Sequence, residues 1–189
     1  MKYIRALILL VVTASLLPAQ TLDMGQNVFF NEEGVINMAV DASVASRTLD
    51  GTYVMFVLYV IADEGAYASI DRKDVVMFHN DKMYTMPSIE EFRKNYSFDR
   101  RDMNMYNRLG KESLIQSEMR FYRFQWSHDF FPARGQRAII TDRGDMSSQL
   151  GFTTKVYFKN PGFKTGDNII IKVTDRKNSE VWGAVTVVL

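Results

Sequence analysis

Residues 52–62 read TYVMFVLYVIA and are apolar at both odd and even positions. Turn-forming residues bracket the stretch, with DG before it and DEG after it. Its length would also suit a helix, but its β-branched and aromatic residues favour a strand. A strand that is apolar on both parities is covered on both of its faces. We therefore expect a central core strand here, with Val57 and Tyr59 in or beside the core.

Short β-like runs separated by turns lie on both sides of this strand. The runs are 35–40, 75–78, 82–85, 137–141, 152–158, 168–174 and 181–188, and residues 117–127 also alternate with strand period. Asn80-Asp81 predicts a tight hairpin turn, because Asn and Asp tolerate the left-handed backbone that such turns need. The polar loop 175–180 predicts that the last two strands are antiparallel neighbours.

The segment at about 87–134 departs from this strand pattern. Ser88 and Glu91 have the spacing of a capping box, which predicts a helix that ends near Asn95. A second helix is expected over 99–109, with Gly110 as its stop. The sequence therefore predicts a single mainly β domain over 21–189 with a helix-containing insertion.

The strand pattern over 35–85 and 136–189 resembles the immunoglobulin-like sandwiches of exported bacterial proteins. The resemblance implies an antiparallel β-sandwich. It carries over no functional residue, because no family motif is matched and the cysteine pair of antibody domains is absent. The structural alternative is a small outer-membrane β-barrel. Its strands should alternate apolar and polar residues, and the stretch 52–62 does not.

Residues 1–20 have the features of a secretory signal peptide. Lys2 and Arg5 form a basic start, and an apolar run over 6–17 ends at Pro18. Twelve apolar residues are fewer than the ~20 that a membrane span requires. We expect cleavage after Ala19 or Gln20, release of the mature chain without stable membrane insertion, and a periplasmic or secreted location.

Charge and composition argue against nucleic acid as a partner and exclude every site that needs cysteine. Removing Lys2 and Arg5 from the 23 basic residues leaves 21 against 22 acids, a net charge of about −1. Such a chain has no overall positive field for nucleic acid. It has no cysteine, and hence no disulfide, thiolate metal site or cysteine nucleophile. An exported chain without disulfides suggests a bacterial envelope or secreted protein.

Few residues suggest catalysis. The chain has two histidines, and no Gly-x-Ser-x-Gly or HExxH motif accompanies them. His79 is expected to be a solvated residue at a hairpin tip, and His128 a packed or edge residue beside Trp126 and Phe130. The sequence indicates no catalytic residue, no metal site and no cofactor.

Two further motifs have alternative interpretations. The acid pairs Asp63-Glu64, Asp99/Asp102 and Asp142/Asp145 lack the spacing of a calcium loop and are expected to be solvated turn residues. The triplet Arg143-Gly144-Asp145 has polar flanks and is expected on an exposed loop, where it could serve in adhesion.

The region 92–137 is the most unusual part of the chain. Its ten basic and five acidic residues give a local charge of +5, and ten aromatic residues are interleaved with them. Arginine with tyrosine and tryptophan is typical of interface hot spots. The alternative is that the aromatic residues pack the insertion onto the sheet and the arginines lie over them. The candidate binding residues are Arg100, Arg101, Tyr106, Arg120, Tyr122 and Arg123.

These features favour an exported binding or structural module that engages another macromolecule of the cell envelope through this region. A protein partner is expected first and a glycan second. The functional alternative is an envelope hydrolase or carbohydrate-active protein, which would need a pocket lined by convergent acids or a histidine.

Overall fold

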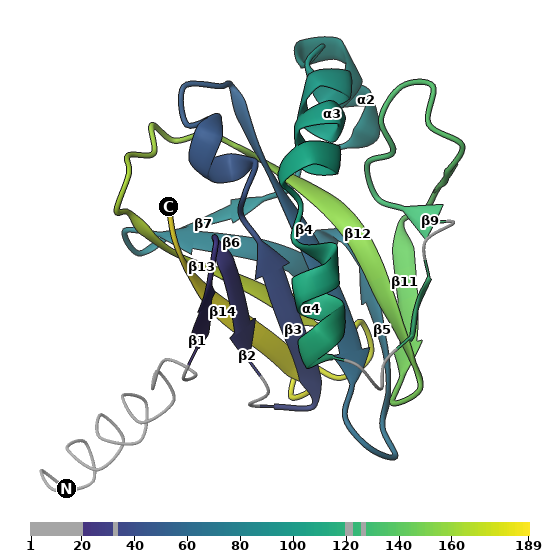
Figure 1. The fold of residues 1–189 in the computed structure, drawn as a ribbon. Coiled ribbons are helices and arrows are strands. Elements are labelled where there is room, and N and C mark those ends of the chain that lie inside the picture. The colour runs from purple at the N-terminus through teal and green to yellow at the C-terminus, as the bar shows by residue number, and fades with distance from the viewer. Residues whose placement is uncertain (1–20, 32–33, 120–122, 126–127) are drawn as a thin grey trace, which may run out of the picture.

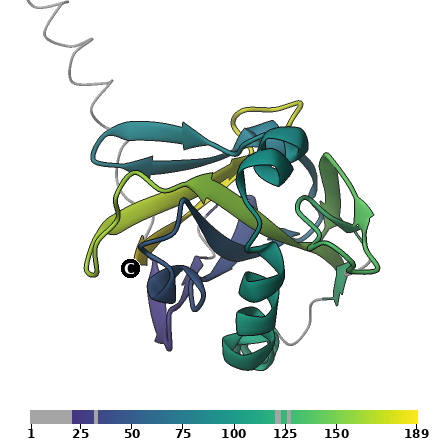
Figure 2. The same cartoon turned by 90° about the horizontal axis from the view of Figure 1, so that it is seen from above.

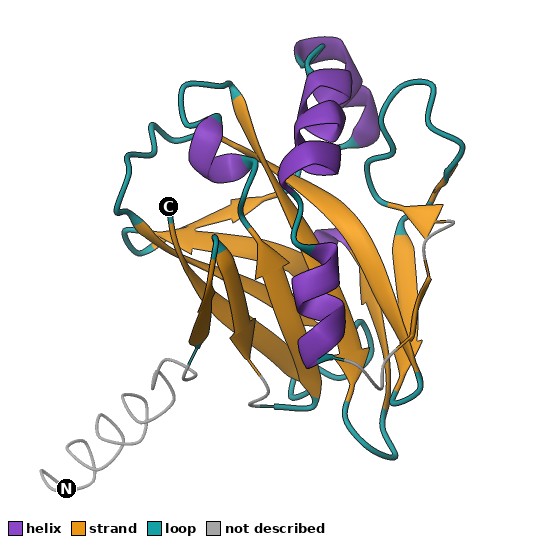
Figure 3. Ribbon diagram, viewed as in Figure 1, coloured by secondary structure: helices purple, strands orange, loops and turns teal. Residues whose placement is uncertain are grey.

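The structure, a computed structural model, describes residues 21–31, 34–119, 123–125 and 128–189. Among these described residues, strands account for 45% and helices for 19%, so the protein is mainly β with a three-helix insertion (Figures 1 and 3). The predicted signal peptide, residues 1–20, lies outside the described residues. None of the described helices combines the length and the apolar character needed to cross a bilayer.

The larger sheet has six strands in the order β1-β2-β3-β4-β12-β8. Their bounds are β1 (Leu22–Gly25), β2 (Val28–Asn31), β3 (Ile36–Asp41), β4 (Tyr53–Ala62), β12 (Leu150–Lys159) and β8 (Arg123–Gln125). All ten residues of β4 are buried, which confirms the prediction of a central core strand. Val57 and Tyr59 both belong to the core, as expected.

The second layer contains a four-stranded sheet in the order β14-β13-β6-β7 and the separate pair β11-β5. Their bounds are β14 (Trp182–Val188), β13 (Asn168–Thr174), β6 (Val75–His79), β7 (Lys82–Thr85), β11 (Arg143–Ser147) and β5 (Tyr67–Asp71). Asn80 and Asp81 join β6 to β7 with φ values of 49° and 60°, and β13 pairs with β14 antiparallel. Both hairpin predictions are confirmed.

The two layers of strands pack face to face, as the view from above shows (Figure 2). On β4 and β12 the odd-numbered Tyr59 and Tyr157 face the helices, so the even-numbered residues of these two paired strands face the second layer. At Gly183 the backbone of β14 approaches β3 so closely that a Cβ would collide with the Ile36 carbonyl oxygen. At Gly144 a Cβ would likewise collide with the Phe152 ring. Glycine is therefore required at both positions by the close approach of the layers.

Three helices cover the opposite face of the larger sheet, namely α2 (Ile89–Asn95), α3 (Asp99–Leu109) and α4 (Glu112–Glu118). The Ser88 Oγ accepts a hydrogen bond from the Glu91 N–H at 3.0 Å, which confirms the predicted cap of α2. The predicted bounds of α3 are also confirmed. The sequence does not predict helix α4, whose end overlaps the strand expected over 117–127. This helix buries Ile115, and the buried Met119 is its C-terminal cap.

The expectation of a purely antiparallel architecture is wrong. β8 pairs with β12 in parallel, and so does β9 (His128–Asp129) with β10 (Ile139–Ile140). Parallel neighbours need a crossover of a dozen or more residues, and the segment 126–149 between β8 and β12 is long enough to supply it. The larger sheet is consequently curled and mixed, and of the strand predicted over 137–141 only β10 forms.

Candidate functional site

One side of α3 carries a line of polar and apolar side chains with the spacing of a single helix face. Arg101, Asn104, Met105, Arg108 and Leu109 form this line, and each is exposed or half-buried. The short 3-10 helix Ala45–Arg47, from the loop that precedes β4, lies across from it and contributes Arg47. Segments more than fifty positions apart thus share one surface.

Between these two elements the surface is hollowed into a groove of about 530 Å³. We call it the arginine groove, and it is lined by Arg47, Arg101, Asn104, Met105, Arg108 and Leu109. Three of these six described residues are arginines and none is acidic, while Met105 and Leu109 are apolar. The groove therefore offers guanidinium donors beside apolar contact area, which suits an anionic ligand with an apolar part.

The three guanidinium groups differ in how they are held. Arg101 contacts Asp102 at 3.2 Å and lies over the Phe98 ring, with 4.7 Å between its guanidinium carbon and the ring centre. Arg47 and Arg108 are exposed, and neither side chain makes a hydrogen bond or ion pair within the described part of the chain. The groove thus has two uncompensated positive charges and one that Asp102 partly offsets.

Asp102 fixes Arg101 from inside the protein. Its side chain is 1% exposed, and its second oxygen accepts a hydrogen bond from the Tyr96 hydroxyl at 2.5 Å. Burial raises the pKa of the Asp102 carboxyl, while the hydrogen bonds from Tyr96 and Arg101 act in the opposite direction. Asp102 accordingly serves as an internal support for one wall of the groove.

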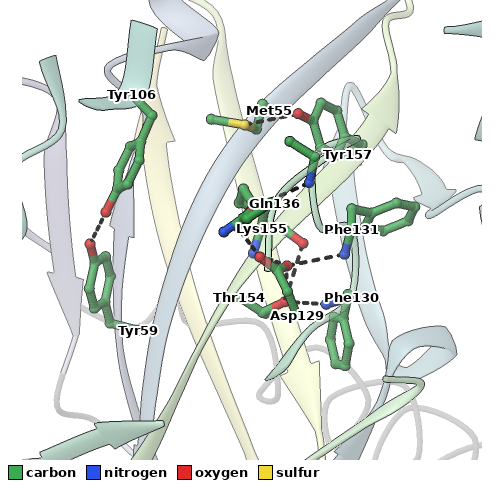
Figure 4. A network of polar contacts seen from close by, with 11 residues as sticks. Met55, Tyr59, Tyr106, Asp129, Phe130, Phe131, Gln136, Thr154, Lys155 and Tyr157 are labelled. Atoms are coloured by element: carbon green, nitrogen blue, oxygen red, sulfur yellow. Dashed lines mark hydrogen bonds and ion pairs between the residues drawn. The ribbon is translucent and has the colours of Figure 1, made fainter. Parts of the chain in front are cut away.

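Further contacts hold α3 against the sheet. The hydroxyls of Tyr106 on α3 and Tyr59 on β4 lie 2.5 Å apart (Figure 4). Burial raises the pKa of both phenols, so both stay protonated at neutral pH. At the start of α3, Asp99 accepts a hydrogen bond from the Arg134 N–H at 2.8 Å. These contacts hold α3 in position on the larger sheet.

A second buried polar cluster lies at the edge of β12 (Figure 4). Asp129 contacts the Lys155 ammonium through one oxygen, and both residues are buried. Its other oxygen accepts hydrogen bonds from the N–H groups of Phe131 and Lys155 and from the Thr154 hydroxyl, at 3.0–3.1 Å. Both carboxylate oxygens are thus engaged, and the cluster fastens the loop after β9 to the sheet.

The predicted binding residues do not gather on one surface. Arg101 lines the groove, whereas Arg100 lies on another side of α3 and donates to the Arg134 carbonyl at 2.8 Å. Tyr106 is turned inward toward Tyr59, and Arg123 is exposed on β8. Arg120 and Tyr122 lie outside the described residues.

Most of the described aromatic residues of the insertion pack inward. Phe92 packs tilted against Tyr157 and edge-on against Tyr53 of the sheet, with ring centres 4.4 and 5.6 Å apart. Tyr96 contacts the same two rings. This packing corresponds to the alternative in which the aromatic residues attach the insertion to the sheet and leave the arginines outside.

Two of the interpretations of individual polar residues are wrong. His79 is not solvated: its side chain is 10% exposed, lies 3.3 Å from Asp167 and packs edge-on against Phe163. Asp99 and Asp102 are buried rather than solvated. The partners of His79 (Phe163 and Asp167) and of Asp99 (Arg134) are distant in sequence. Asp102 is instead held by Tyr96 and Arg101, which belong to the same insertion. His128 is half-buried in β9, as expected of a packed or edge residue.

The Arg143-Gly144-Asp145 triplet lies in strand β11 and not on a loop. Its backbone pairs with β5, and Asp145 accepts a hydrogen bond from the Ser69 hydroxyl at 2.7 Å. Gly144 is buried because the Phe152 ring lies beneath it. The triplet therefore lacks the projecting loop geometry that its polar flanks suggested.

Sequence reasoning missed most of the groove. The helical spacing of residues 101, 104, 105, 108 and 109 could have identified one wall, since the sequence predicts α3 itself. No local signal connects Arg47 to this wall, because its position depends on how the loop before β4 folds. Within the described residues, no group of three or more His, Asp or Glu side chains is arranged to hold a metal ion.

The fold and the groove define a mainly β protein with a helical insertion that presents a cationic surface. Comparison with known protein families, with curated proteins and with solved structures found no match for the chain.

Proposed function

We propose that this protein is an exported, non-enzymatic module that binds another macromolecule, a protein first and a glycan second, through its Arg/aromatic-rich region. The observation that carries the proposal is the arginine groove, where three guanidinium groups surround a hollow with no acidic lining residue among those described. Arginine is enriched at binding hot spots because its planar fork makes paired hydrogen bonds and its stem covers apolar area.

The alternative of a hydrolase has less support. Acid–base chemistry needs a carboxylate or histidine within hydrogen-bond reach of a bound substrate. The groove has neither among its described lining residues. The buried Asp129 and Lys155 are engaged with each other and with backbone donors. The groove therefore fits an anionic partner that is only bound better than a substrate that an acid or base must activate.

We also propose that the β framework is a variant of the immunoglobulin-like sandwich and that the mature chain begins near Gln20 or Thr21. Two layers that meet at Gly183 and Gly144 support the first point. The basic and apolar residues before Pro18 support the second. N-terminal sequencing of the exported protein is the direct test, and a chain that still begins at Met1 would refute export with cleavage.

The binding proposal is tested by affinity capture from an envelope extract with the full chain expressed and purified. We expect the Arg47→Glu/Arg108→Glu variant to capture about tenfold less partner than the parent protein, because charge reversal repels an anionic surface. The control is Arg93→Glu/Lys94→Glu on α2, which changes the charge equally at exposed positions outside the groove. Equal loss in both variants, or in neither, would contradict a role for the groove.

A further inference from the structure

The spacing of the cationic groups along the arginine groove indicates what kind of ligand it takes. Arg101 and Arg108 are seven residues apart on α3, which places their Cα atoms about 10 Å apart along the helix axis. Met105 lies between them on the same side, and Leu109 follows Arg108. The wall therefore presents charge, apolar surface and charge in succession.

An extended peptide can match this spacing. In polyproline II conformation a chain repeats every three residues with a rise of about 3.1 Å per residue, so residues i and i+3 point the same way about 9 Å apart. Acidic side chains at i and i+3 would meet Arg101 and Arg108. In a β-strand the same two positions would point to opposite faces.

The other lining residues also suit a peptide. Met105 and Leu109 can pack against an apolar side chain between the two acids. The Asn104 amide has a donor and an acceptor, as a peptide backbone does. Arg47, on the opposite wall, can close over the bound segment. A small inorganic anion would use the guanidinium groups and leave the apolar part of the groove uncovered.

We propose that the arginine groove binds an extended acidic segment of a partner protein, with carboxylates at positions i and i+3 and an apolar residue between them. This inference rests on the proposed function and specifies its ligand. Arg47 and Arg108 supply guanidinium groups that are not engaged within the described residues. Arg101, 46% exposed and already in contact with Asp102, keeps further N–H donors for the second carboxylate.

The test measures fluorescence anisotropy with three labelled peptides, of which the first two share one composition. One peptide contains Glu-Pro-Leu-Glu, a second contains the isomer Glu-Pro-Glu-Leu, and a third replaces both glutamates by glutamine. We expect the first peptide to bind about tenfold more tightly than the third, and measurably more tightly than the isomer. Arg108→Glu should weaken binding of the first peptide about tenfold, whereas the control Arg93→Glu should leave it unchanged.

The other outcomes separate this inference from the proposed function. Equal affinity for the two isomers would overturn it, because the groove would then respond to charge without spacing. Binding of a polyuronate or of inorganic phosphate, but of no peptide, would also overturn it. If no peptide binds while envelope capture still depends on Arg47 and Arg108, the ligand class is wrong and the proposed function stands. If capture is independent of the groove as well, both are wrong.

Discussion

Asp175 shows how a single side chain can hold a loop between strands. It begins the turn that joins β13 to β14, and one of its oxygens accepts a hydrogen bond from the Ser69 N–H at 2.7 Å. The other oxygen accepts from the N–H groups of Lys177 and Asn178, each at 2.9 Å. Partial burial acts to raise the pKa of this carboxyl, but the three backbone donors outweigh it and the pKa is lowered.

Asp175→Asn should destabilise the protein by about 1–2 kcal/mol at pH 7, because an amide has only one acceptor oxygen. The folded pKa lies below the ordinary carboxyl value, so the contribution is complete above about pH 4 and is lost as the pH falls through the folded pKa. Urea unfolding of both proteins at pH 7 and at pH 3 measures the difference. We expect it to shrink at the lower pH.

The matched control is Asp50→Asn, which removes an exposed carboxylate without described side-chain partners. It should change the free energy of unfolding by less than about 0.5 kcal/mol. A difference between Asp175→Asn and the parent that stayed constant from pH 7 to pH 3 would contradict the assigned hydrogen bonds.

At the scale of the element, the contact between α3 and β4 positions the groove. Tyr59 is fully buried on β4, and its hydroxyl meets that of Tyr106 on α3. Ring packing alone would leave the helix free to shift along the sheet, because apolar contacts have no fixed direction. The hydroxyl pair adds a directional contact.

A double-mutant cycle of Tyr59→Phe and Tyr106→Phe tests this contact. Tyr106→Phe should cost about 1–2 kcal/mol of unfolding free energy, because it leaves the Tyr59 hydroxyl buried without this partner. The double variant should cost less than the sum of the two single variants, since it removes both hydroxyls of the pair together. Urea unfolding of the four proteins gives the coupling energy, and strictly additive costs would show that the hydroxyls do not interact.

At the scale of the whole molecule, β4 is the central strand that joins β3 to β12 and lies between the helices and the second strand layer. It pairs with β3 and β12 along its edges, while its two faces are covered by the helices and by the second strand layer. Val57 is 2% exposed and lies between Asp41 of β3 and Lys155 of β12. A defect here would disturb both layers together.

Val57→Asp should abolish cooperative folding. The new carboxylate would be buried beside Asp41, and Lys155 is already paired with Asp129. An unpaired buried charge costs several kcal/mol, against a total stability of about 5–15 kcal/mol. Near-ultraviolet circular dichroism and thermal melting measure the loss. Thr52→Asp, at the exposed position just before β4, is the control, and a Val57→Asp protein that melted like it would refute the central role of β4.

The sequence by itself determined the features that a few neighbouring residues control. Apolar residues on both parities specify β4, because such a strand gains free energy only when both faces are buried. The left-handed residues Asn80 and Asp81 set the β6–β7 turn. Ser88 sets the start of α2 through one local hydrogen bond. In each case the stabilising contact lies within one turn of helix or one pair of strands.

Only the tertiary structure decided which distant segments meet. Three features depend on chain crossings that no local propensity encodes: the parallel pairing of β8 with β12, the contact of His79 with Asp167, and the approach of Arg47 to α3. Such contacts form when the summed burial of both layers offsets the entropy of closing long loops. The arginine groove belongs to this group, because its two walls come from segments that only the folded sheet brings together.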